Sequence, residues 1–225
     1  MELVDLSHSI EHGMITYKGL PAPLICDYLS REDSKKKYAP GTEFQIGKIE
    51  MVSNTGTYLD CPFHRYADGN DLSQIQLESL AELNATLIDA ENYQSIGKSF
   101  FEGKELAGKA VLVHTGWSKH WRTDTYFENH PFLTKEAADY LVAQKVKLVG
   151  IDSHNIDDTR INTRPVHSAL LKNEILIVEH MTNLQSLKGK RFIFNAAPPR
   201  FVGVGTFPVR AYAKISDATD TFKVS

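Results

Sequence analysis

The sequence predicts an α/β fold in which helices flank a mixed β-sheet. From residue 85 onward, short runs rich in β-branched residues recur, and segments with helical periodicity separate some of them. Apolar residues make up 42% of the 225-residue chain, which is enough for a substantial core. From residue 109 to 179 the order is strand, helix, strand, helix, strand, which favours partly parallel pairing.

Several strands are expected in order along the chain. Alternating apolar and polar residues predict a strand over 44–52, with a bulge near Gly47 and Lys48. The preceding charged stretch, 31–37, mixes both signs and is expected to be a solvated loop or a short helix. Further strands are expected over 85–90, 109–115, 147–152, 174–179, 191–195 and 208–215.

Two helices have recognisable start signals. Thr134 is a good N-cap for a helix that runs through Gln144, and Glu136 in its first turn is favoured by the helix dipole. Pro165 suits the first turn of a second helix. The chain contains no repeat, low-complexity tract or linker, so we expect one domain over residues 1–225.

Composition excludes several classes of partner. Lys and Arg total 25 and Asp and Glu total 28, giving a net charge of −3, so no broad cationic field exists to bind nucleic acid or a membrane surface. The first residues lack the pattern of a signal peptide, and a soluble, cytoplasmic protein is expected. Cys26 and Cys61 are too few for a disulfide framework, and Cys61 is expected to be a buried, inert thiol.

The segment 53–64 brings polar residues together near the end of a predicted strand. If the chain stays extended through Asp60, then Asn54, Tyr58 and Asp60 share one face. The alternative is a turn in which Asp60 accepts hydrogen bonds from nearby amides ahead of Pro62. The first reading predicts a polar site and the second a local structural role.

Two later residues favour the site. His167 opens the predicted second helix, and Glu179 directly follows the apolar run 175–178, where a strand leaves the core. Sites of α/β folds lie at strand ends. Asp60, His167 and Glu179 form a nitrogen and oxygen ligand set suited to zinc or manganese, with open positions for water. Taken singly, Glu179 could instead be a solvated strand terminus and His167 a surface histidine.

Three other histidines are weaker candidates. His8 in the N-terminal segment and His154 after a predicted strand could approach the pocket, although loop histidines often have solvent or backbone partners. His114 lies within an apolar run and is expected to be a packed strand residue.

Together these segments resemble the metal-dependent cyclase family, which contains bacterial kynurenine formamidases and isatin hydrolase. The family signature His-x-Gly-Thr-His-x-Asp-x-Pro-x-His falls on Asn54 through His64. The resemblance implies the swivelling β/β/α fold and a homodimer or homotetramer. Other matching segments, which extend over nearly the whole chain, are 5–10, 13–14, Tyr17, 19–21, 115–117, 150–153, 156–157, 165–167, 178–179 and 182–184.

The first half of the signature departs from the family pattern. Family members hold two metal ions, and the first two signature histidines are ligands of one of them. Here those positions are Asn54 and Tyr58. Neutral Asn is a weak oxygen ligand, and Tyr must lose a proton with a reference pKa of about 10. The resemblance therefore implies one divalent ion per chain, zinc or manganese, held by Asp60, His167 and Glu179.

The resemblance also implies a metal-dependent hydrolase of an amide or related carbonyl compound, such as an N-formyl aryl amine or a strained cyclic amide. The expected partner is a small molecule, with an aromatic substrate as one option. The ion would activate water for attack on the carbonyl, with His64 as general base and acid and Tyr58 as a donor to the oxyanion. The alternative is a catalytically inactive member that binds a small molecule or is a structural subunit, which Asn54 and Tyr58 favour. The survival of Asp60, His64, His167 and Glu179 favours the enzyme.

Overall fold

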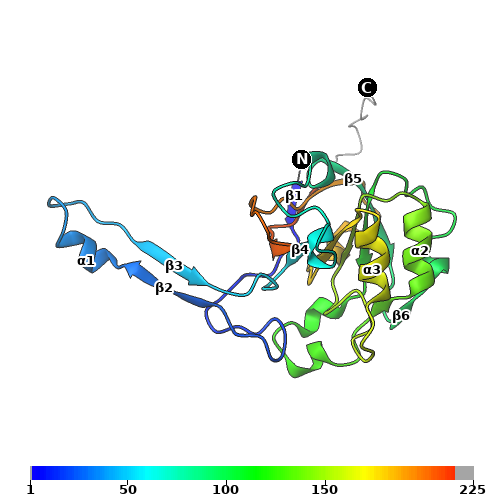
Figure 1. Ribbon diagram of the computed structural model, residues 1–225, viewed down its shortest axis with the longest axis horizontal. Coiled ribbons are helices and arrows are strands. Elements are labelled where there is room, and N and C mark those ends of the chain that lie inside the picture. The colour runs from blue at the N-terminus through cyan, green and yellow to red at the C-terminus, as the bar shows by residue number, and fades with distance from the viewer. Residues whose placement is uncertain (1, 216–225) are drawn as a thin grey trace.

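The computed structural model describes residues 2–215, and most of its strands form one nine-stranded mixed sheet (Figure 1). The strand order across this sheet is β1-β13-β11-β5-β7-β9-β10-β4-β12. Two further pairs, β2 with β3 and β6 with β8, form small separate ribbons. The strands are β1 (Glu2–Asp5), β2 (Leu24–Leu29), β3 (Ile46–Glu50), β4 (Tyr58–Asp60), β5 (Leu83–Asp89), β6 (Ser95–Ile96), β7 (Ala110–His114), β8 (Phe132–Leu133), β9 (Leu148–Ile151), β10 (Leu176–Glu179), β11 (Phe192–Asn195), β12 (Thr206–Pro208) and β13 (Tyr212–Ile215).

The middle of the large sheet is parallel, and its two sides are antiparallel. β5, β7, β9 and β10 pair in parallel, as the strand and helix order predicts. β11 joins β5 antiparallel on one side, and β4 joins β10 antiparallel on the other. The predicted mixed sheet of an α/β fold is therefore confirmed.

One strand prediction is wrong. The expected strand 208–215 is two strands, β12 and β13, which occupy distant places in the sheet order. In a flat sheet seven strand spacings would separate them by about 34 Å. The chain from Pro208 to Tyr212 spans at most about 14 Å. The sheet must therefore curl until its two sides approach each other. At this closure the amide of Thr182, which lies after β10, donates to the carbonyl of Leu6, which follows β1 (3.0 Å).

The described residues also form three α-helices, of which the two longer ones, α2 and α3, pack side by side (Figure 1). The Thr134 hydroxyl accepts a hydrogen bond from the amide of Ala137 (3.2 Å), which confirms the predicted cap of α2. Pro165 is the first residue of α3, as expected. No helix in residues 2–215 is long and apolar enough to cross a membrane. The helices are α1 (Arg31–Lys35), α2 (Lys135–Ala143) and α3 (Pro165–Lys172), and the short 3₁₀ segments are η1 (Pro62–His64), η2 (Leu77–Ser79), η3 (Lys98–Phe100), η4 (Trp117–His120), η5 (Asp124–Phe127) and η6 (Leu184–Leu187).

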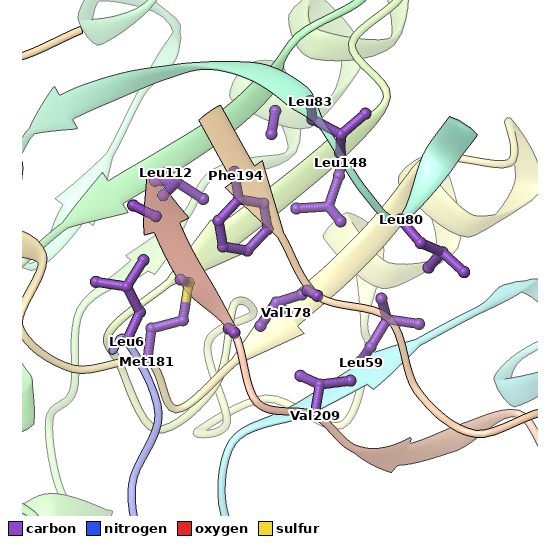
Figure 2. Packing of buried hydrophobic residues seen from close by; sticks show 14 of the residues in the cluster. Leu6, Leu59, Leu80, Leu83, Leu112, Leu148, Val178, Met181, Phe194 and Val209 are labelled. Carbon is purple, nitrogen blue, oxygen red and sulfur yellow. The ribbon is translucent and has the colours of Figure 1, made fainter. Parts of the chain in front are cut away.

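The core has two parts, one on each face of the sheet. Successive residues of a strand point to opposite faces, so Leu112 of β7 belongs to one cluster and Val111 and Val113 belong to the other. Figure 2 shows the first cluster, to which Leu59, Val178 and Phe194 of three strands contribute together with Met181. The second cluster includes residues of α2 and α3 and packs both helices against the sheet.

The ribbon of β2 and β3, with α1 at its tip, forms an arm that projects away from the body (Figure 1). The strand expected over 44–52 is found as β3. Gly47 pairs with Asp27 and Ile46 pairs with Leu29, so the irregularity lies near Gly47 but its extra residue, Tyr28, belongs to β2. The Ser30 hydroxyl caps α1 by accepting from the amide of Asp33 (3.1 Å).

Candidate functional site

A pocket of about 320 Å³ opens between the ends of β4 and β10 and the start of α3. Most of the residues singled out from the sequence line it, whereas Asp60 is fully buried and is not part of the lining. Its lining includes Tyr58, His64, His167 and Glu179, together with two arginines, Arg65 and Arg164.

The register of two strands brings three site residues to one face. β4 pairs antiparallel with β10, and Tyr58 lies opposite Glu179. Because side chains alternate along a strand, Tyr58 and Asp60 share a face while Leu59 turns into the core (Figure 2). Of the two readings of this segment, the chain extended from Asn54 is not found: the backbone turns at Gly56, where φ is +67°, and only Tyr58–Asp60 is a strand. Asn54 nevertheless lines the same pocket.

A buried carboxylate positions His167. Asp157 Oδ1 accepts a hydrogen bond from the amide of Val166 (2.7 Å), and its Oδ2 accepts from the amide of His167 (3.0 Å). These two bonds cap α3, because Arg164 at the N-cap provides no side-chain cap. The imidazole Nδ1 of His167 lies 2.6 Å from Asp157 Oδ2. Asp157 therefore fixes the ring with Nδ1 as donor and turns Nε2 toward the pocket.

His167 Nε2 faces two carboxylates. It lies 3.6 Å from Asp60 Oδ2 and 3.7 Å from Glu179 Oε1. Asp60 Oδ2 is buried and has no hydrogen-bond partner, which is costly for a carboxylate oxygen. Two ligands of one tetrahedral ion at about 2.1 Å lie about 3.4 Å apart. Each of the two distances from His167 Nε2 is therefore close to that between two ligands of one divalent cation, and the unpartnered Asp60 oxygen is available to such an ion.

The second oxygen of Glu179 is already surrounded by neutral donors. The Tyr58 hydroxyl donates to Glu179 Oε2 (2.7 Å), and Asn155 Nδ2 and the Tyr17 hydroxyl lie 3.4 Å from the same oxygen. The hydroxyls of Tyr17 and Tyr58 are 3.0 Å apart. Burial, followed by the charge of Glu179, raises the pKa of Tyr58 well above its ordinary value. Tyr58 is therefore a neutral donor and not a phenolate ligand.

Burial and neighbouring charges shift the pKa values of Glu179 and His167. Burial raises the pKa of Glu179 to about 7, against the opposing charge of His167. Burial alone would lower the pKa of His167, but Glu179, Asp157 and Asp60 together raise it to about 10. Without an ion, His167 therefore carries a proton in place of a metal.

His64 lies at the exposed side of the cluster. Its Nδ1 is 2.8 Å from the Thr206 hydroxyl, which in turn donates to Asp60 Oδ1 (2.5 Å). Since the single hydroxyl hydrogen goes to the carboxylate, His64 Nδ1 donates to Thr206 and Nε2 keeps a free lone pair. Possible ligand atoms of Asp60, His64 and His167 all lie within 4.8 Å of one another. This group does not include Glu179, whose contact is with His167.

Sequence reasoning did not assign roles to Asp157, Thr206, Tyr17 and Asn155. Asp157 and Tyr17 lie in segments that match the family, but nothing local marks them as supports of His167 and Glu179. Thr206 is 146 residues from Asp60 and becomes its neighbour only through the pairing of β12 with β4. Supporting contacts of this kind follow no spacing rule that a single sequence reveals.

The other candidate residues lie outside the lining of the pocket. The His8 ring stacks on Trp121 with centroids 4.2 Å apart. His154 contacts Tyr17 of the pocket wall with its ring (centroids 4.5 Å apart) and with its backbone carbonyl, which accepts from the Tyr17 hydroxyl (2.9 Å). His114 is a buried residue of β7, as expected. Cys61 is fully buried, and burial raises the pKa of its thiol to about 11, as expected for an inert side chain.

Comparison with known proteins agrees with the resemblance. Kynurenine formamidase of Bacillus cereus is 28% identical over 211 residues, which cover 93% of this chain and 96% of the relative. An uncharacterized protein of Methanocaldococcus jannaschii is 30% identical, with coverage of 95% and 99%. The solved structure of isatin hydrolase A from Labrenzia aggregata bound to benzyl benzoate superposes with a TM-score of 0.78 at 19% identity, covering 94% of this chain and 93% of that one.

A protein-family model described as "Putative cyclase" matches residues 4–158, more than half of the chain. This match includes β4 with Asp60 and ends before α3 and β10, while the two relatives cover more than nine-tenths of the chain. The chain belongs to the cyclase family.

Proposed function

We propose that the protein is a metal-dependent hydrolase that cleaves the carbon–nitrogen bond of an amide. One observation carries this proposal: His167 Nε2 lies 3.6 Å from Asp60 Oδ2 and 3.7 Å from Glu179 Oε1, in a buried place where Asp60 Oδ2 has no partner. The relatives named kynurenine formamidase and isatin hydrolase support the class of reaction.

Asp60, His167 and Glu179 would hold one divalent ion per chain, zinc or manganese. A bound ion of this kind acts as a Lewis acid and makes water available as a nucleophile near neutral pH. A second ion is disfavoured, because Tyr58 fills the approach to Glu179 Oε2 with a hydroxyl that keeps its proton. Asn54 adds only a neutral amide to the same wall.

His64 moves the protons in the proposed reaction. Its free Nε2 accepts a proton from the attacking water as the water oxygen bonds to the carbonyl carbon. The carbon–nitrogen bond then breaks, and Nε2 returns that proton to the leaving nitrogen. The products are a carboxylic acid and an amine, which together contain all the atoms of the amide and one water.

Tyr58 is the proposed donor to the oxygen that becomes negative when the carbonyl is attacked. Its hydroxyl stays protonated at the pocket wall, and donation to the substrate would replace its bond to Glu179. Tyr17 and Leu20 on the same wall offer an aromatic and an apolar surface for an aryl group. An N-formyl aryl amine or a strained cyclic amide suits these walls.

The proposal is tested by measuring metal content and hydrolysis together. Elemental analysis of the purified protein should give one zinc or manganese ion per chain, and His167→Ala or Glu179→Ala should remove it. N-formylkynurenine, aryl formamides, cyclic amides and lactones are then assayed with and without a chelator. Turnover that the chelator abolishes supports the hydrolase. No turnover of any substrate with either metal would favour a catalytically inactive member that binds small molecules.

We also propose that the protein forms a homodimer or homotetramer, as the family resemblance implies. An isolated two-stranded ribbon is marginally stable in water, yet the arm exposes Ile25 and Ile49, which pair directly across β2 and β3. A second copy of the chain would cover this surface. Light scattering should give a dimer or larger for the wild type, and a monomer for Ile25→Lys/Ile49→Lys. A monomeric wild type would refute this part.

A further inference from the structure

Two arginines at the pocket are not explained by the chemistry above. Arg65 directly follows His64 and is exposed, and Arg164 directly precedes α3 and is half-buried. Both line the pocket that contains His167 and Glu179. A guanidinium keeps its charge at any ordinary pH, so the pocket has two permanent positive charges beside its carboxylates.

Ser168 ties both arginines to the first turn of α3. Its hydroxyl donates to the backbone carbonyl of Arg164 (2.7 Å) and accepts from Nε of Arg65 (3.2 Å). One nitrogen of the Arg164 guanidinium donates to the carbonyls of Ile161 (2.7 Å) and Thr163 (2.9 Å). These contacts hold the two side chains in place but use only part of their donors.

Neither guanidinium has an acidic partner among residues 2–215. Elsewhere on the protein, Arg122, Arg160 and Arg210 each pair with a carboxylate at 2.7 to 2.9 Å. Arg65 and Arg164 contact only neutral oxygens, although the chain has 28 acidic residues. Their remaining N–H groups are therefore available to a ligand in the pocket.

We propose that Arg65 and Arg164 bind a carboxylate of the substrate, so that the substrate class is an aryl amide that carries an acidic group. This inference rests on the proposed hydrolase function. The planar fork of a guanidinium matches the two oxygens of a carboxylate, and such charge-assisted bonds are short and strong. The amide lies toward Asp60, His167 and Glu179, and the carboxylate lies toward the arginines.

The test compares matched substrates with and without the charge. Formanilide is neutral, and 2-, 3- and 4-formamidobenzoate add one carboxylate at three positions of the same ring. The wild type should prefer at least one formamidobenzoate over formanilide. Arg65→Met and Arg164→Met should each lower kcat/KM for that substrate by about 10-fold or more, and leave formanilide within about twofold. Arg200→Met is the control, because Arg200 donates to the carbonyl of Ser73 outside the pocket.

Three results would overturn the inference: no preference for any formamidobenzoate, an equal loss on formanilide and the charged substrate, or an equal effect of the control. A binding measurement separates this failure from failure of the proposed function. Calorimetry with the three aminobenzoates and with aniline needs no turnover. The wild type could fail to hydrolyse any substrate and still bind an aminobenzoate in a manner that requires Arg65 and Arg164. That result would support the anion site and refute the hydrolase function.

Discussion

Asp157 offers the sharpest test of how the ligand set is supported. Its carboxylate accepts from the amides of Val166 and His167 and from His167 Nδ1 at 2.6 Å. In Asp157→Asn only one oxygen remains, so the amide nitrogen must face one of these three donors. Where it faces Nδ1, the ring shifts its proton to Nε2, the atom that would bind the ion. Loss of such a support lowers metal affinity by about 10- to 100-fold, or about 1.4 to 2.7 kcal/mol.

The affinity for Zn²⁺ or Mn²⁺ is measured by competition with a chromophoric chelator. Asp158→Asn is the matched control, because Asp158 is the next residue and pairs with Arg160 (2.8 Å) away from His167. The unmet donor at the start of α3 should also lower the free energy of unfolding by about 1 to 3 kcal/mol, measured by chemical denaturation without metal. An Asp157→Asn protein whose metal affinity stays within twofold of the wild type would refute the reasoning.

Three further outcomes are expected. Tyr58→Phe removes the proposed oxyanion donor and should lower kcat about 100-fold while elemental analysis still gives one ion per chain, so an unchanged kcat excludes that role. A Cβ at Gly205 would lie 2.2 Å from the amide nitrogen of His64, so Gly205→Ala should displace His64 and lower activity, whereas Gly97→Ala, with open space around it, should not. Because the pKa of His167 is raised to about 10, ion binding at pH 7 should release about one proton or more and weaken as the pH falls. Calorimetry in buffers of different ionisation enthalpy measures this release, and its absence would contradict the protonated apo site.

The part of the fold that local sequence determines was predictable. β-branched runs such as 109–115, the cap at Thr134 and the helix-starting Pro165 place β7, α2 and α3. The separation of β12 from β13 was not predictable, because it depends on the closure of the curled sheet and not on residues 208–215 themselves. The arm was missed at β2, where apolar residues are exposed to solvent and give no clear alternation.

The candidate site likewise has a part that the sequence predicts and a part that it does not. Residue type and strand ends identify Asp60, His167 and Glu179 as a possible ligand set, and the family resemblance adds His64. The contacts that orient them come from elsewhere: Thr206 reaches Asp60 through a neighbouring strand, and Asn155 reaches Glu179 from a loop. Such supports depend on tertiary packing, which spacing in one sequence does not encode.

Tyr58 of β4 lies directly opposite Glu179 of β10, so the chemistry of the site depends on the register of β4 with its neighbouring strands. A slip of one residue would turn Tyr58 and Asp60 into the apolar interior and present Leu59 to the substrate. β12 borders β4 as the last strand and ends at Pro208, which has no amide hydrogen to offer an incoming strand. Substitutions where β12 meets β4, far from any reacting atom, can therefore abolish activity by misaligning a strand. The helices and most of the core would stay intact.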